Sequence, residues 1–261
     1  MQLLKDKVVV VTGVGPGMGR KLATIAAEEG AKVAMCARSL GFLDEVAAEI
    51  RQAGGQAIAV AADMGDEAAC PRVAEAAREA FGRIDGLVAS AYMPANWMGF
   101  ENSTTEAWIA NMDITCFGAL RMARAVLPAM KAAGGGAIVN ISALANAQPL
   151  PNQAEYAVAK AALEGATRQL AKEFGPYRIR VNATRMGWLW GAPVKGFVQA
   201  EAQRLGVPEE QVIAPIAAKM ALGVIPPEED CARTALMFLS DYTKMVTGTV
   251  LNVNGGEYFN P

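Results

Sequence analysis

The feature that most constrains the fold is a glycine-rich turn between a short apolar strand and an alanine-rich helix. The β-branched run Lys7–Thr12 leads directly into this turn. Glycine allows positive φ and close approach of a ligand to the backbone, and a helix start offers free N–H groups to phosphate. The alternative is a turn that binds nothing. Its position after a first strand favours a dinucleotide site. The residues expected to hold the dinucleotide are Gly13, Gly15, Gly17, Met18 and Gly19.

Strands and helices alternate along the rest of the chain. Strands are expected at 7–12, 32–37, 56–61, 86–90, 137–141, 178–183 and 250–253. Helices are expected between them, including 40–53, 67–81, 105–133, 154–174, 196–205 and 228–240. Such alternation predicts an α/β protein with a central parallel sheet, in three layers, as in a doubly wound Rossmann fold. One domain is expected over 1–261, with 187–227, rich in Gly, Pro and Trp, as a lid over a pocket.

Composition narrows the classes of function. The formal net charge of −2 gives no basic excess for nucleic acid. Apolar runs are too short for a membrane span, and the start of the chain lacks the layout of a signal peptide, so a cytoplasmic location is expected. Histidine is absent and the four cysteines are widely spaced, which argues against a metal site and against Ser-His-Asp catalysis. We expect a small-molecule substrate and no nucleic-acid or membrane partner.

A tyrosine and a lysine are placed to handle protons. Tyr156 and Lys160 are four residues apart, so they share one face of a helix. A free phenol has a pKa of about 10, and a nearby cation lowers it. Such a phenol can exchange a proton with a carbonyl or carbinol oxygen. Taken alone, the spacing is common, and an ordinary surface pair is the alternative.

The end of the second strand bears on the choice of cofactor. Ala37-Arg38-Ser39 carries no carboxylate for a ribose 2′-hydroxyl but does carry an arginine that can pair with a 2′-phosphate. This favours NADP(H) over NAD(H), unless Arg38 is merely an exposed side chain. Asp63 follows the third strand, where it can accept a hydrogen bond from adenine or serve as an ordinary turn residue.

These motifs together resemble the short-chain dehydrogenase/reductase superfamily, in its NADP-preferring branch, over nearly the whole chain. The matching segments are Thr12–Gly19, Asp63, Ile138–Ser142, Tyr156–Lys160, Arg180–Asn182 and Thr247–Gly256. The resemblance implies that Tyr156 transfers the proton, while Lys160 lowers the pKa of Tyr156 and holds the nicotinamide ribose. It also implies a dimer or tetramer. Further cofactor contacts implied by the resemblance are Met64, Ala91, Gly187 and Leu189.

The chain departs from the family at catalytic positions. Counting back from Tyr156, the catalytic serine of the family corresponds to Ala143, with Ser142 beside it. Neighbours on a strand face opposite sides, so Ser142 substitutes only if the strand end bulges. Thr115 replaces an asparagine, Tyr92 a glycine and Met186 a proline. Losing one hydrogen-bond donor costs about 10²–10³ in rate.

Three explanations stay open for this departure. Ser142 or Tyr92 supplies the missing hydrogen bond, the substrate supplies it, or position 143 has been altered. The alternative function is therefore a cofactor-binding regulatory or scaffold protein with weak or lost catalysis, or an inactivated variant of an enzyme.

Large apolar side chains favour a hydrophobic, cyclic or aromatic ketone or secondary alcohol as substrate. The alternative role of these side chains is to pack the lid against the core. They are Trp97, Phe100, Trp188, Trp190, Phe197 and Met220. The candidate substrate contacts are Tyr92, Trp97, Ala143, Gln153, Trp188 and Trp190. No cluster of Arg or Lys marks this region, so an acyl-carrier substrate is less favoured.

Overall fold

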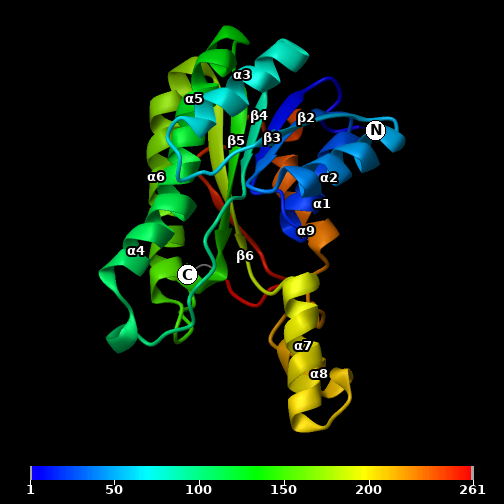
Figure 1. Ribbon diagram of the computed structural model, residues 1–261, viewed down its shortest axis with the longest axis vertical. Coiled ribbons are helices and arrows are strands. Elements are labelled where there is room, and N and C mark those ends of the chain that lie inside the picture. Colours follow the sequence, from blue (N-terminus) through cyan, green and yellow to red (C-terminus); the bar gives the residue numbers. More distant parts are fainter. Residues whose placement is uncertain (1, 260–261) are drawn as a thin grey trace.

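The computed structural model describes residues 2–259, which form one sheet of seven parallel strands (Figure 1). The strands are β1 (Val8–Thr12), β2 (Lys32–Ala37), β3 (Gln56–Ala61), β4 (Gly86–Ala89), β5 (Gly136–Ala143), β6 (Ile179–Met186) and β7 (Val250–Val253). Their order is β3-β2-β1-β4-β5-β6-β7. The order reverses between β1 and β4, and in such sheets ligands bind outside the carboxyl ends of the strands at this point.

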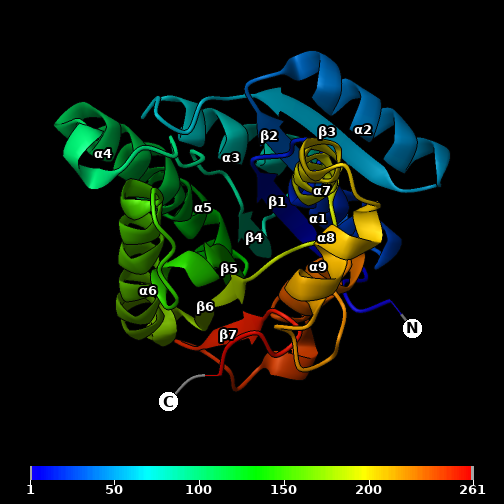
Figure 2. The same ribbon diagram turned by 90° about the horizontal axis from the view of Figure 1, so that it is seen from below.

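Helices cover both faces of the sheet, which confirms the predicted three-layer fold (Figure 2). They are α1 (Met18–Glu28), α2 (Leu40–Gln52), α3 (Ala69–Phe81), α4 (Thr105–Met112), α5 (Gly118–Ala132), α6 (Ala154–Phe174), α7 (Ala192–Leu205), α8 (Glu209–Ala217) and α9 (Glu228–Met237). One buried cluster joins the sheet to α1, α2 and α9. A second joins it to α3, α5 and α6. None of the helices in residues 2–259 is long and apolar enough to cross a bilayer.

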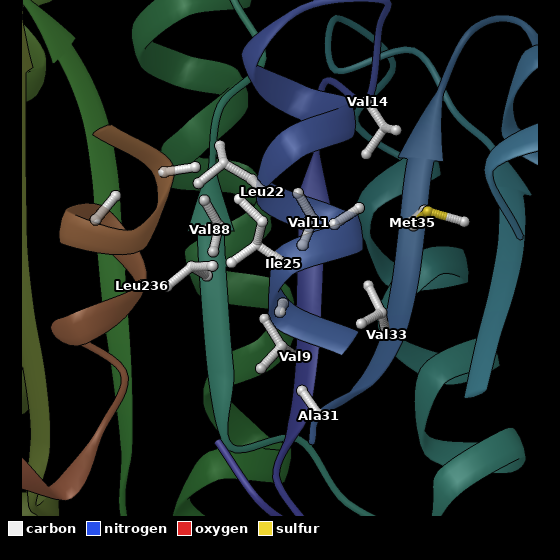
Figure 3. Close-up of a cluster of buried hydrophobic side chains, with 14 of the residues drawn as sticks. Val9, Val11, Val14, Leu22, Ile25, Ala31, Val33, Met35, Val88 and Leu236 are labelled. Carbon is white, nitrogen blue, oxygen red and sulfur yellow. The ribbon is translucent and has the colours of Figure 1, made fainter. Parts of the chain in front are cut away.

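The central strand β1 shows why its sequence reads as an unbroken apolar run. Val9 and Val11 enter the cluster with α1 and α9, to which Leu22 and Leu236 also belong (Figure 3). Val10 enters the cluster on the opposite face. Because successive side chains of a strand alternate and both faces are covered, every residue of β1 must be apolar or internally bonded.

The long helix expected at 105–133 is interrupted. A π-helical turn at Asp113–Phe117 separates α4 from α5. Thr115 lies in this turn, where its Oγ1 donates to Oδ1 of Asn111 at 2.9 Å and accepts from the backbone N–H of Met93 at 3.0 Å. These bonds tie the turn to the loop after β4. The apolar period continues on both sides of the turn, so the sequence pattern did not reveal it.

The predicted lid contains two helices rather than one. α7 begins at Ala192, earlier than expected, and α8 was not predicted because Pro208 caps it and Pro215 lies inside it. The two helices share a small core of their own. Figure 1 shows them together below the sheet, apart from α4. They are linked to the start of α9 by a hydrogen bond of 2.8 Å from Trp190 N to Pro226 O.

Candidate active site

Two glycines of the turn after β1 are required by its own packing. Gly13 has φ of 71°, and its N–H donates to the carbonyl of Cys36 at 2.9 Å. A Cβ at Gly13 would lie 2.5 Å from the backbone of Ala91. A Cβ at Gly19 would overlap the carbonyl oxygen of Gly13. Any larger residue at either position would force the turn apart.

The other two glycines leave backbone open to a ligand. A Cβ at Gly15 would meet nothing within 4 Å. Gly17 is the N-cap of α1, makes no side-chain cap, and is followed by no acidic residue in the first turn, which starts at Met18. The first N–H groups of a helix need partners, and phosphate oxygens satisfy them well. The turn therefore fits the pyrophosphate of a dinucleotide.

Arg38 lies directly after β2, two residues beyond Cys36, whose carbonyl accepts the hydrogen bond from Gly13. It is exposed and, within residues 2–259, has no hydrogen-bond or ion-pair partner. The guanidinium is therefore available to an anion beside the turn. The exposed Asp63 uses one oxygen to accept from the N–H of Gly65 at 2.9 Å. The side chain of Met64 is buried in the core, so only its backbone can face a ligand.

The loop after β4 connects the turn to the Tyr/Lys pair. Oγ1 of Thr12 accepts from the N–H groups of Ser90 and Ala91, at 3.1 and 3.3 Å. The next residue, Tyr92, lies against Tyr156 with a ring-centroid separation of 5.9 Å. The ammonium of Lys160 is 5.4 Å from the ring centroid of Tyr92 and 5.7 Å from that of Tyr156. The structure thus brings both phenols and the buried lysine together.

Burial controls the protonation of this group. It lowers the pKa of Lys160 to about 7, against the weaker opposing effects of Cys116 and Glu164. Nζ of Lys160 donates to the carbonyl of Ile141 at 2.6 Å, which fixes the side chain. Burial, and then Tyr92, raise the pKa of Tyr156 above its ordinary value. In this state Tyr156 keeps its proton at neutral pH.

Ser142 faces away from the position expected for a catalytic hydroxyl. β5 stays extended through Ala143, without a bulge. Oγ of Ser142 donates to Oε1 of Glu164 at 2.8 Å and accepts from Asn146 at 3.2 Å. Glu164 also forms a buried ion pair of 2.6 Å with Arg185. These bonds engage Ser142, which argues against it as a partner of Tyr156.

The segment after β6 leads from the sheet to α7, in the predicted lid. A Cβ at Gly187 would lie 2.7 Å from Oε2 of Glu257, so the C-terminal segment packs closely on it. Leu189 packs against the core under α1. Trp188 packs against Phe197 in a tilted arrangement with a centroid separation of 5.7 Å. Both Trp188 and Trp190 pack on the small core shared by α7 and α8.

The aromatic residues expected around the substrate divide into two groups. Trp188, Trp190 and Phe197 belong to the lid. Trp97 belongs to the loop after β4, is 64% exposed and has φ of 60°. Gln153 is the half-buried N-cap of α6, next to Tyr156. The ring of Phe100 packs against Trp108 of α4, at a centroid distance of 6.0 Å. Figure 1 shows α4 and the lid on either side of the lower end of the sheet.

Sequence reasoning missed two acidic residues near the site. Glu164 follows Lys160 by one helical turn, a spacing that would have placed the two on one face. Glu228, at the start of α9, is 7% exposed and lies against the dinucleotide turn. An acidic residue in the first turn of a helix is common, so the sequence around Glu228 carried no signal of this contact.

Comparisons with known proteins place the whole chain in context. The family model described as enoyl-(acyl carrier protein) reductase matches residues 13–257. The chain is 32% identical to cis-4-hydroxycyclohexanecarboxylate dehydrogenase of Sinomonas cyclohexanicum, over 96% of each chain. It is 31% identical to levodione reductase of Leifsonia aquatica, over 97% of this chain and 94% of the relative. The structure of L-sorbose reductase from Gluconobacter frateurii, complexed with NADPH and L-sorbose, superposes with a TM-score of 0.94 at 27% identity, covering 100% of both chains.

Proposed function

The chain belongs to the short-chain dehydrogenase/reductase family, and from this premise we propose an NADP(H)-dependent enzyme for a hydrophobic, cyclic or aromatic ketone or secondary alcohol. The observation that carries the proposal is the Tyr156–Lys160 pair, joined through the loop after β4 to an uncapped dinucleotide turn. When bound, the nicotinamide supplies hydride exchange. The protein supplies binding, orientation and the proton.

Tyr156 is proposed as the proton donor and acceptor at the substrate oxygen. Because burial raises its pKa, the phenol holds its proton at neutral pH and is ready to donate to a carbonyl oxygen. Lys160 is fixed by Ile141, and its own pKa of about 7 makes its charge sensitive to small changes nearby. A charged Lys160 would stabilise the phenolate and lower the pKa of Tyr156.

NADP(H) is proposed over NAD(H) because Arg38 is exposed and unpaired within the described residues, beside the turn. The NADPH in the complex of L-sorbose reductase supports this choice. The residues proposed to hold the cofactor are Gly13, Gly15, Gly17, Met18, Gly19, Arg38, Asp63, Met64, Ala91, Tyr156, Lys160, Gly187 and Leu189. Those proposed to contact substrate are Tyr92, Trp97, Ala143, Gln153, Trp188 and Trp190. The relative from Sinomonas cyclohexanicum is named for a cyclohexane substrate, which supports a cyclic substrate.

The experiment follows NADPH oxidation over a panel of cyclic and aromatic ketones, with wild type and Tyr156→Phe. Wild type should turn over at least one ketone, and Tyr156→Phe should lose this activity while still binding NADPH. Tyr177→Phe, which alters a phenol elsewhere on the surface, is the matched control. Full activity in Tyr156→Phe would exclude the assigned proton donor.

A second candidate, a cofactor-binding protein with weak catalysis, is favoured by one observation. Position 143 is an alanine, and the neighbouring hydroxyl of Ser142 is engaged by Glu164. This candidate predicts tight NADPH binding with no turnover of any ketone in the panel. A cytoplasmic location and a homodimer or homotetramer also stay predictions. Assembly into an oligomer is supported by exposed apolar side chains on α4, on the π-turn and on α6, namely Ile109, Phe117 and Val158. Light scattering would measure the mass of the oligomer.

A further inference from the structure

A single carboxylate lies where two helices begin. Glu228 is the first residue of α9, and its Oε1 lies 3.1 Å from where a Cβ at Gly17 would be. A Cβ at Gly191 would overlap the same carboxylate. Gly17 is the N-cap of α1 and Gly191 is the N-cap of α7. Figure 2 shows α1, α7 and α9 near one another.

Most of the Glu228 residue is covered, and its carboxylate has no partner within residues 2–259. Only 7% of Glu228 is exposed, and within residues 2–259 its side chain forms neither a hydrogen bond nor an ion pair. Burial, and then the neighbouring Glu229, raise its pKa. Lys21 of α1 and Lys195 of α7 act in the opposite direction, but Lys21 is already paired with Glu229 at 2.5 Å. Covering a charged group without giving it a partner is costly.

The surroundings of Glu228 are built for an anion. The starts of α1 and α7 each present uncapped N–H groups and a positive dipole end. Lys21 and Lys195 add positive charge. Burial, and then Glu228, raise the pKa of the Tyr92 phenol, so Tyr92 also lies within electrostatic reach. The start of α1 is also where the pyrophosphate of a dinucleotide is expected. Two like charges would repel each other there.

We propose that Glu228 occupies the anion position of the dinucleotide site in the free protein, and that cofactor binds beside this carboxyl group in its neutral form. The inference rests on the proposed function, because it assumes a dinucleotide at the turn. Binding then takes up a proton at Glu228, and affinity falls as pH rises. Gly191 is required in this arrangement because a side chain there would expel Glu228.

The test is calorimetric titration of NADPH and NADH into wild type, Glu228→Gln and Asp230→Asn, from about pH 6 to about pH 8. Glu228→Gln keeps the shape of the side chain and removes its charge. Asp230 lies exposed in the same helical turn, so Asp230→Asn controls for charge on α9. At the upper pH, Glu228→Gln should bind both cofactors about tenfold more tightly than wild type, as expected for charges a few ångströms apart near a surface. At the lower pH the difference should shrink.

A measurement on wild type alone keeps the test independent of how Glu228→Gln folds. Titration with NADH in two buffers of different ionisation enthalpy measures proton uptake directly, and NADH carries no 2′-phosphate to titrate. Uptake by wild type, absent in Glu228→Gln, is the expected result. No uptake by wild type, or identical pH profiles for wild type and Glu228→Gln, would overturn the role of Glu228. Failure of every variant to bind either cofactor would instead overturn the proposed function.

Discussion

Replacing Gly13 by alanine should destabilise the protein, whereas replacing Gly15 should weaken cofactor binding alone. A Cβ at Gly13 would sit 2.5 Å from the backbone of Ala91, while ordinary carbon contacts are about 3.5–4.0 Å. The β1 turn and the loop after β4 must therefore move apart by about 1 Å. Residue 13 also has φ of 71°, which costs a non-glycine residue about 1–2 kcal/mol.

With about 1–3 kcal/mol for overpacking, Gly13→Ala should lower the free energy of unfolding by about 2–5 kcal/mol. The melting temperature should fall by about 5–15 °C. Gly15 has no positive φ and no neighbour within 4 Å, so Gly15→Ala should leave stability within about 0.5 kcal/mol of wild type. Its Cβ would instead enter the space of the pyrophosphate and weaken NADPH binding by about tenfold or more.

The assay combines thermal unfolding without cofactor and calorimetric titration with NADPH, on wild type and both variants. Gly13→Ala should lose stability and Gly15→Ala should lose affinity for NADPH. If Gly13→Ala melts with wild type, or if Gly15→Ala loses as much stability as Gly13→Ala, the division of the turn into packing and binding glycines is refuted.

Two further variants test the proton chemistry. Ala143→Ser, at the 8% exposed end of β5, should raise kcat by about 10²-fold for a ketone that wild type reduces, and an unchanged kcat would show that this hydroxyl is not limiting. The pKa of Lys160 is about 7 in the folded protein and about 10.4 in the unfolded chain. Between these two pH values the unfolded state binds more protons than the folded state. The free energy of unfolding should therefore rise with pH across this range. Lys160→Met should flatten that rise in urea unfolding followed at several pH values, and an unaltered slope would contradict the assigned shift.

The sequence predicted the glycine-rich turn after β1, the strands, and the shared helix face of Tyr156 and Lys160. Each of these depends on residues close together in the chain. Gly13 and Gly19 follow from a strand-to-helix turn, and the buried run of β1 follows from a sheet covered on both faces. The side-chain alternation of β5 also predicted that Ser142 would face away from Ala143, which the bond of Ser142 to Glu164 bears out.

Other features depend on contacts between distant segments. The π-turn is held by Thr115 bonding to the loop after β4, and nothing in the helical period marks it. The raised pKa of Tyr156 comes from burial, whereas the sequence suggested only the effect of Lys160. Glu228 meets Gly17 and Gly191 only after the chain folds, so its place at the cofactor site could not be inferred from neighbours in sequence.

The central claim is that the turn and Arg38 hold NADP(H), and a comparison of NADPH and NADH affinities tests it most directly. Titration of wild type should give NADPH the lower Kd by about tenfold or more, as expected for a charged hydrogen bond to the 2′-phosphate. Arg38→Ala should bring the two Kd values together. Tighter binding of NADH, or binding of neither cofactor, would contradict the claim.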